Sequence, residues 1–305
     1  MTGVQTCALP IYTRYPVTGS PNPRARLHLI DTGAGGIRQT IPLPSDVEYV
    51  LPLFSWTPDG REALYLTVSR DHTELKLWGW NPVSVTDRTI ITETDPTWIN
   101  EYLYTPPVFI ADGSRFLWLS ERSGFMQLYL YTAKGELVRQ LTSGNWLIET
   151  SPWNLITAGR PVHVEPSGRK AYFITTAVTP LERRLMVLDI NTGTLEPVST
   201  QPGFHLFSLS GDGAWLVYQY SAVPTPPVTT VVHTDRSATR QLARCSGPSL
   251  QLPAVTREFV TLKAQDGADL YGQLVKPEGF DPSRSYPVVI HWYGGPTLQM
   301  VSNRY

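Results

Sequence analysis

A repeated pattern occurs four times in the chain, and it restricts the fold more than any other feature: an apolar run, then an Asp-Gly or Ser-Gly turn motif, then a second strand-like run. The motif falls at Asp59, Asp112, Ser167 and Asp212, at intervals of roughly 45 to 55 residues. Short apolar runs such as "FLWLS" and "AYFIT" flank the motif; they have the length of β-strands and no sustained helical periodicity. Because glycine tolerates the positive φ of tight hairpin turns, each motif predicts two antiparallel strands joined by a two-residue turn.

Periods of about 40 to 50 residues with roughly four strands each are typical of β-propeller blades. We therefore predict a mostly β fold with propeller blades over residues 12–253; an irregular β-sandwich is the alternative. Each blade must bury its faces against neighbours, so these blades are too few for most closed propellers, and we expect the chain to be a fragment. The four repeats begin near Leu53, at Pro107, at His163 and at Phe207, and a partial blade covers Tyr12 to about Leu51.

The composition excludes several classes of protein. The 305 residues include 25 basic and 26 acidic ones, with a formal net charge of −1, which gives no electrostatic surface for nucleic acid. No apolar run approaches the roughly 20 residues that span a bilayer. Two cysteines, Cys7 and Cys245, cannot form a disulfide framework, so the cellular compartment stays open. The six histidines show no metal-site spacing, and we expect neither a metal nor a cofactor.

Residues 1–11, "MTGVQTCALPI", differ in character from the rest of the chain. They lack the basic start and the long apolar centre of a signal peptide. The stretch looks like a translated adapter tail, and we expect it to be a non-native segment that takes no part in the fold.

The pattern changes after Pro253. "EFVTLKA" and "LYGQLVKP" predict a hairpin through Asp266 and Gly267. A polar loop comes next, and then the apolar run "YPVVIHW" predicts a buried strand that ends in Tyr-Gly-Gly-Pro. This arrangement is typical of the first strands of an α/β sheet and differs from a further blade.

The stretch "DG…LYGQLVKPEGFDPSRSYPVVIHWYGGP" resembles the start of the catalytic domain in the prolyl oligopeptidase family of serine peptidases, nearest to its dipeptidyl peptidase IV branch. "RYPVTGSPNPRARLHLID" and "FLWLSERSGFMQLYLY" resemble propeller stretches of the same branch. The resemblance covers nearly everything from Tyr12 to Tyr305. It implies a propeller over residues 12–253, followed over residues 254–305 by the truncated start of an α/β-hydrolase domain. It also implies a peptide substrate, release of N-terminal Xaa-Pro or Xaa-Ala dipeptides, and no cofactor.

The resemblance implies one catalytic residue, Tyr293. In the family, the tyrosine of this loop donates its hydroxyl to the oxyanion of the tetrahedral intermediate, while Gly294, Gly295 and Pro296 let the backbone turn tightly beside the substrate. Judged on spacing alone, Tyr293 would be interpreted as an aromatic residue at a strand end with no catalytic role. Thr297 stands where relatives often have histidine, which leaves the subfamily open. Tyr102 aligns loosely with an aromatic residue that lines the substrate pocket of relatives; packing within a blade is the alternative.

An α/β-hydrolase needs a nucleophile on a G-x-S-x-G elbow, and no serine of this chain has that context. In the family, the catalytic Ser, Asp and His come after the loop, and a glutamate pair that binds the substrate amine would precede Tyr12. We therefore expect the chain alone to be inactive. Relatives of this branch often dimerise, which would make the full-length parent a homodimer. An endopeptidase, an acylaminoacyl-type peptidase and a non-catalytic propeller that binds peptides or partners are the alternative functions.

Overall fold

The structure is a computed structural model in which strands dominate and the one helical element of the described part is a short 3₁₀ helix, η1 (Glu101–Leu103). The described residues are 19, 24–33, 35–45, 47, 49–150, 160–246, 255–295 and 299–305. The predicted tail, residues 1–11, lies outside these ranges.

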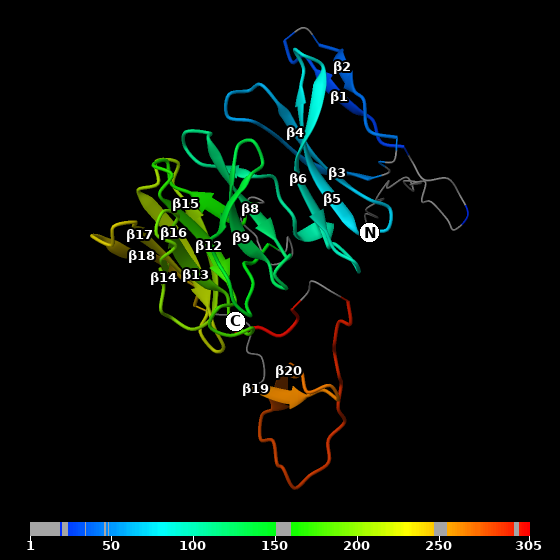
Figure 1. Ribbon diagram of the computed structural model, residues 1–305. Coiled ribbons are helices and arrows are strands. Elements are labelled where there is room, and N and C mark those ends of the chain that lie inside the picture. The colour runs from blue at the N-terminus through cyan, green and yellow to red at the C-terminus, as the bar shows by residue number, and fades with distance from the viewer. Residues whose placement is uncertain are drawn as a thin grey trace, which may run out of the picture.

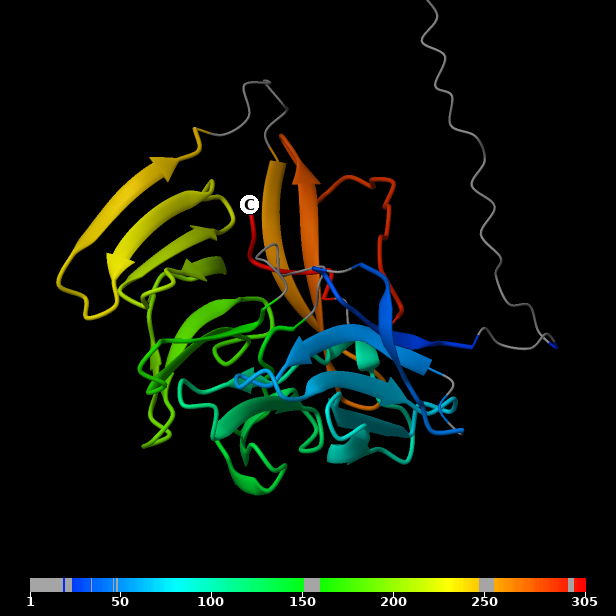
Figure 2. The same ribbon diagram turned by 90° about the horizontal axis from the view of Figure 1, so that it is seen from above.

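Four antiparallel sheets of four strands succeed one another along the chain and lie side by side in an arc (Figures 1 and 2). We call them blades 1 to 4, and in each of them the strands pair in chain order. The predicted propeller blades are confirmed, and the irregular sandwich is not formed. The strands are β3 (Tyr49–Trp56), β4 (Ala63–Val68), β5 (Glu74–Asn81) and β6 (Thr86–Thr94) in blade 1; β7 (Val108–Phe109), β8 (Arg115–Ser120), β9 (Gln127–Thr132) and β10 (Leu137–Gln140) in blade 2; β11 (Val162–Val164), β12 (Lys170–Thr175), β13 (Arg184–Asp189) and β14 (Leu195–Pro197) in blade 3; and β15 (Phe204–Leu209), β16 (Trp215–Ser221), β17 (Val228–His233) and β18 (Thr239–Arg244) in blade 4.

Two further strand pairs flank these blades. β1 (Leu27–Ile30) and β2 (Ile37–Ile41) form a two-stranded sheet, here called blade 0, that packs on blade 1. The partial blade ends before Tyr49 and not near Leu51, because β3 already belongs to blade 1. Pro52 lies inside β3, where a break in the β3–β4 register between Leu51 and Ser55 accommodates it.

The Asp-Gly and Ser-Gly motifs join the first and second strands of each blade, but the turn is longer than predicted. The Gly60 amide donates to the Thr57 carbonyl (2.8 Å), and the Thr57 amide donates to the Glu62 carbonyl (3.0 Å). The two-residue prediction is wrong because the Asp59 carboxylate also accepts the Arg61 amide (3.1 Å), which stabilises a wider turn. Glycine is required there, with φ of 68° at Gly60, and the same holds for Gly113, Gly168 and Gly213.

The core lies between the blades. A large apolar cluster joins blades 1, 2 and 3, and a smaller one joins blades 3 and 4. The second strands β4, β8 and β12 are buried on both faces over most of their length, so continuous apolar runs predict them correctly. In contrast, β16 alternates between buried and exposed side chains, which marks one face of blade 4 as uncovered.

His205 makes the stability of blade 4 depend on pH. Its ring is fully buried in β15, with Nε2 2.9 Å from the Gln201 carbonyl oxygen and Nδ1 3.0 Å from the Ser199 hydroxyl. Burial lowers the pKa of His205 from 6.5 to about 4. In the unfolded chain this histidine is therefore protonated near pH 6.5, whereas in the folded chain it stays unprotonated until the pH is much lower. As the pH drops from 6.5 towards 4, the free energy of unfolding therefore falls, by at most about 3 kcal/mol.

The measurement is a pair of denaturant titrations at pH 7 and pH 5, for the wild type and for His205→Gln. We expect the variant to lose stability at pH 7 but to show a smaller difference between the two pH values. An unchanged pH difference in the variant would assign the acid sensitivity to other groups.

Candidate functional site

The candidate site lies beyond the hairpin of β19 (Val255–Lys263) and β20 (Asp269–Pro277). This hairpin confirms the prediction for residues around Asp266 and Gly267. The predicted buried strand at 286–292 is wrong: no strand forms there, and Val289 is 93% exposed. An apolar run of this kind is buried when strands flank it and helices cover it. Among the described residues no strand pairs with this run and no helix covers it, so the apolar pattern alone forms neither strand nor core.

Tyr293 comes directly after this exposed run, and its side chain is itself 56% exposed. Its hydroxyl has no hydrogen-bond partner within the described ranges. A phenol hydroxyl can donate one hydrogen bond while remaining neutral at physiological pH. Among the described residues the Tyr293 hydroxyl is thus available as a hydrogen-bond donor, which is the chemical property that stabilisation of an oxyanion requires.

The ring of Tyr293 lies over Gly295. A Cβ added to Gly295 would lie 2.6 Å from Cε1 and 2.9 Å from the hydroxyl oxygen of Tyr293. Neither Gly294 nor Gly295 has a positive φ, so the absence of a side chain matters here for space and not for backbone conformation. That Gly294 and Gly295 let the backbone turn tightly beside a substrate stays a prediction, and the structure adds a packing contact at Gly295. Pro296 lies outside the described residues.

The residues after the loop return to the propeller. The amide of Asn303 donates to the Leu181 carbonyl (2.7 Å), and the Asn303 side-chain oxygen accepts the amide of Val223 (2.9 Å). The Arg304 guanidinium lies over the Phe204 ring, 4.8 Å from its centre. These contacts hold residues 299–305 against blades 3 and 4. No sequence motif marked them, because each partner is separated from Asn303 or Arg304 by many tens of residues.

Tyr102 belongs to η1, the one helical coil drawn, which lies at the end of blade 1 nearest the hairpin (Figure 1). The side chain is 74% exposed, so the alternative of packing within a blade is wrong. Beside it, the Glu101 carboxylate contacts His72 Nδ1 (3.0 Å), and the His72 ring stacks on Trp98 with 3.9 Å between centres. No hydrogen bond or ring contact joins Tyr102 to Tyr293.

Two acidic side chains, Glu121 and Asp95, lie near η1. Burial, with a smaller contribution from the Asp95 carboxylate, raises the pKa of Glu121. Asp95 itself accepts the amides of Thr97 and Trp98 at 2.8 and 3.0 Å, which holds the loop before η1. Sequence reasoning did not single out Glu121 as perturbed, because its burial depends on the packing of blades 1 and 2.

In the part of the chain that the structure describes, no group of three or more His, Cys, Asp or Glu comes together to hold a metal ion. The same residues include no helix that is long and apolar enough to cross a bilayer.

Successive four-stranded blades, followed by a hairpin and a Tyr-Gly-Gly loop, define the class as a β-propeller protein with an appended segment. Residues 8–227 match the family described as "Dipeptidyl peptidase IV (DPP IV) N-terminal region", and the chain belongs to this family.

Two curated relatives illustrate the similarity. Mouse "Dipeptidyl peptidase 8" is 27% identical, over 96% of this chain and 40% of the relative. "Probable dipeptidyl peptidase 4" of Emericella nidulans is 24% identical, over 96% of this chain and 38% of the relative. The chain therefore spans about two fifths of the length of these relatives.

Two solved structures are similar in fold. Dipeptidyl peptidase 4 of Porphyromonas gingivalis superposes with a TM-score of 0.78 at 27% identity, covering 92% of this chain and 38% of that chain. A putative dipeptidyl aminopeptidase IV from Bacteroides ovatus superposes with a TM-score of 0.81 at 25% identity, covering 96% and 43%.

Proposed function

We propose that this chain is part of a serine-type dipeptidyl peptidase, in which Tyr293 stabilises the oxyanion formed during cleavage of a peptide. The observation that carries the proposal is the free Tyr293 hydroxyl, which comes after the blades and the hairpin that succeeds them. The family and the names of the relatives support the same assignment.

The proposed chemistry is acyl transfer. A serine nucleophile attacks the peptide carbonyl, its proton passes to a general base, and negative charge develops on the carbonyl oxygen. The Tyr293 hydroxyl donates a hydrogen bond to that oxygen, which lowers the barrier because the donor is already in place when the charge appears. The tetrahedral intermediate then expels the amine, and water releases the dipeptide. Substrates would carry proline or alanine as their second residue.

Residues 254–305 include the hairpin and the loop, and we propose that they are the start of an α/β-hydrolase domain. The chain contains no G-x-S-x-G elbow, and none of its histidines is assigned a catalytic role. The site proposed here therefore stabilises charge and needs a nucleophile from another part of the peptidase.

The test compares the 305-residue chain with the complete polypeptide that the gene encodes, using a Gly-Pro chromogenic substrate with a free or a blocked amino terminus. We expect no turnover by the 305-residue chain, because it has no nucleophile elbow. The complete polypeptide should cleave the free-amine substrate and be inhibited by a serine-directed reagent.

Other outcomes separate the alternatives. A preference for blocked substrates would overturn dipeptidase activity in favour of an acylaminoacyl-type peptidase or an endopeptidase. A complete polypeptide without a G-x-S-x-G elbow would overturn peptidase activity altogether and favour a propeller that binds peptides.

A further inference from the structure

One position in the last strand of each blade meets the neighbouring blade. We call it the clamp position. In blades 1 to 4 it pairs with the third-strand residue that lies two before the last residue of that strand, which we call the corner. In blade 0 the matching pair involves Leu29, one residue before the end of β1. The pairs are Leu29–Gln39 in blade 0, Gly79–Arg88 in blade 1, Leu130–Arg139 in blade 2, Val187–Glu196 in blade 3 and Val231–Arg240 in blade 4.

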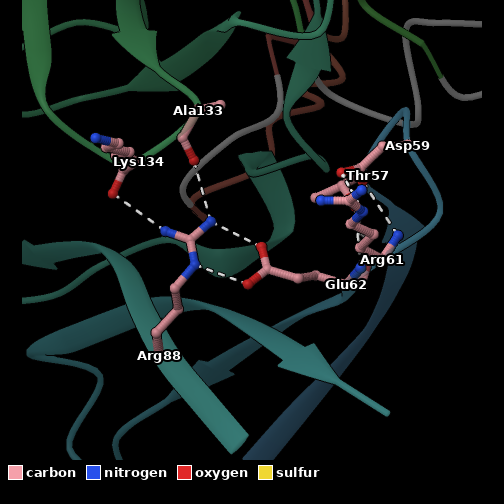
Figure 3. Close-up of polar contacts among 7 residues, drawn as sticks. All are labelled: Thr57, Asp59, Arg61, Glu62, Arg88, Ala133 and Lys134. Carbon is pink, nitrogen blue, oxygen red and sulfur yellow. Dashed lines mark hydrogen bonds and ion pairs between the residues drawn. The ribbon is translucent and has the colours of Figure 1, made fainter. Parts of the chain in front are cut away.

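Arg88 shows how the position works (Figure 3). Its guanidinium is held by the Glu62 carboxylate of the same blade, at 2.8 and 2.7 Å. It then donates across the junction to the main-chain carbonyls of Ala133 (3.1 Å) and Lys134 (3.2 Å). Both carbonyls belong to the turn between the third and fourth strands of blade 2, one and two residues after the corner at Thr132. The Arg88 side chain of blade 1 thus binds the main chain of blade 2, and no side chain of blade 2 takes part in this contact.

The same contact recurs at the neighbouring junctions. The Gln39 amide of blade 0 donates to the Pro82 carbonyl, one residue after the corner of blade 1 (3.3 Å). Arg139 of blade 2 donates to the carbonyls of Ile190 (2.5 Å) and Asn191 (2.7 Å), one and two residues after the corner of blade 3. Three successive junctions therefore use a donor at the clamp position and carbonyls at equivalent places in the next turn.

At the junction of blades 3 and 4 the roles are reversed. Glu196 occupies the clamp position, and an ionised carboxylate cannot donate to a carbonyl. Instead, Arg236 in the turn of blade 4 reaches back to the Pro197 carbonyl (3.0 Å), with the Glu196 carboxylate at 3.8 Å. The contact between clamp position and turn is thus preserved at all four junctions of the described blades.

Blade 4 carries the donor again, but none of the described blades covers it. Arg240 is exposed and has no partner among the described residues, and all six residues of β18 are exposed. On the same face, Val231 and Val217 pair across the strands, and Trp215 lies two residues before Val217. Trp215 and Val217 are 41% and 37% exposed, whereas the equivalent strands of the other blades are buried on both faces.

We propose that Arg240 is a fifth clamp: its guanidinium donates to main-chain carbonyls in the turn between the third and fourth strands of the propeller blade that covers this face in the complete polypeptide. The face continues the interface that joins blades 0 to 4, with the same donor at the same register position and an apolar surface beside it. The proposal concerns assembly of the propeller and is independent of whether the complete polypeptide is a peptidase.

Arginine-specific labelling with phenylglyoxal, read by mass spectrometry, tests the proposal in the 305-residue chain and in the complete polypeptide. Arg240 should label readily in the chain and about tenfold more slowly in the complete polypeptide. Labelling of Arg139 should be slow in both samples, because its guanidinium already bonds two carbonyls of blade 3. Labelling of Arg61, which is exposed, should be fast in both samples. Equal labelling of Arg240 and Arg61 in the complete polypeptide would overturn the proposal. If labelling of Arg240 in the 305-residue chain became slower as the protein concentration rose, the face would bind a second copy of the chain. This result would also overturn the proposal.

A matched pair of variants gives a second readout. In the complete polypeptide, Arg240→Met should speed amide hydrogen exchange in β18 severalfold, while Arg244→Met in the same strand should not. Arg240→Gln should retain part of the protection, because Gln39 makes this contact with an amide. None of the three should alter exchange in the 305-residue chain. Equal effects of Arg240→Met and Arg244→Met would show that Arg240 makes no clamp. Neither experiment measures peptidase activity. A negative result would therefore overturn the Arg240 clamp without bearing on the proposed function.

Discussion

Replacing Tyr293 with phenylalanine should lower kcat of the complete peptidase by about 10²–10³, which is the typical cost of removing one oxyanion donor. The substitution removes only the hydroxyl, and the ring can still lie over Gly295 as it does in the wild type. Because the hydroxyl is proposed to bond the oxyanion and not the ground-state substrate, KM should change little. Steady-state kinetics on a Gly-Pro substrate provide the measurement.

Tyr286→Phe is the matched control, since it removes a tyrosine hydroxyl seven residues earlier that accepts the Asp281 amide at 3.0 Å. We expect it to reduce stability slightly and to leave kcat near the wild-type value. A Tyr293→Phe enzyme with wild-type kcat would remove Tyr293 from the proposed mechanism. A rise in KM with unchanged kcat would make it a substrate-binding residue instead.

Glu149→Gln should lower the free energy of unfolding by about 3–5 kcal/mol, the cost of breaking a buried ion pair on one side. The Glu149 carboxylate and the Arg183 guanidinium are 2.5 Å apart, and their side chains are only 4% and 3% exposed. The substitution leaves the arginine buried without its counter-charge. The main-chain amide of Glu149 donates to the Ile174 carbonyl (2.8 Å) and so joins the segment after blade 2 to blade 3. The loss of stability should therefore also weaken the attachment of this segment to blade 3.

Denaturant titration measures this loss, and Glu258→Gln is the control. Glu258 pairs with Lys276 in the exposed hairpin, where such a pair contributes about 0–1 kcal/mol. The double variant Glu149→Gln with Arg183→Met should be more stable than Glu149→Gln alone, since it removes the uncompensated charge. Similar losses for Glu149→Gln and Glu258→Gln would contradict a buried, coupled pair.

Much of the fold was predictable because it is encoded in neighbouring residues. The glycines after Asp59 and Asp112 adopt positive φ, and the runs "FLWLS" and "AYFIT" form the buried strands β8 and β12. The site was predictable only through the resemblance to a family. Tyr293 has no local signal that separates a catalytic tyrosine from an exposed aromatic residue, and whether it acts in catalysis stays a prediction.

The predictions that were wrong depended on contacts between residues far apart in the chain, which the local sequence does not encode. The run at 286–292 has the composition of a buried strand, yet Val289 is exposed, because burial depends on neighbouring elements and not on the run itself. Tyr102 looked suited to packing in a blade and instead lies exposed on η1.

The sequence alone thus determined the blades, the positions of their turns and the hairpin, since backbone preferences and hydrophobic spacing act over a few residues. Only the tertiary structure revealed the Arg88 and Arg139 clamps, the buried Glu149–Arg183 pair and the return of Asn303 to blades 3 and 4. These contacts join residues far apart in the chain, and they form only when the angle and register between blades bring a donor to its acceptor.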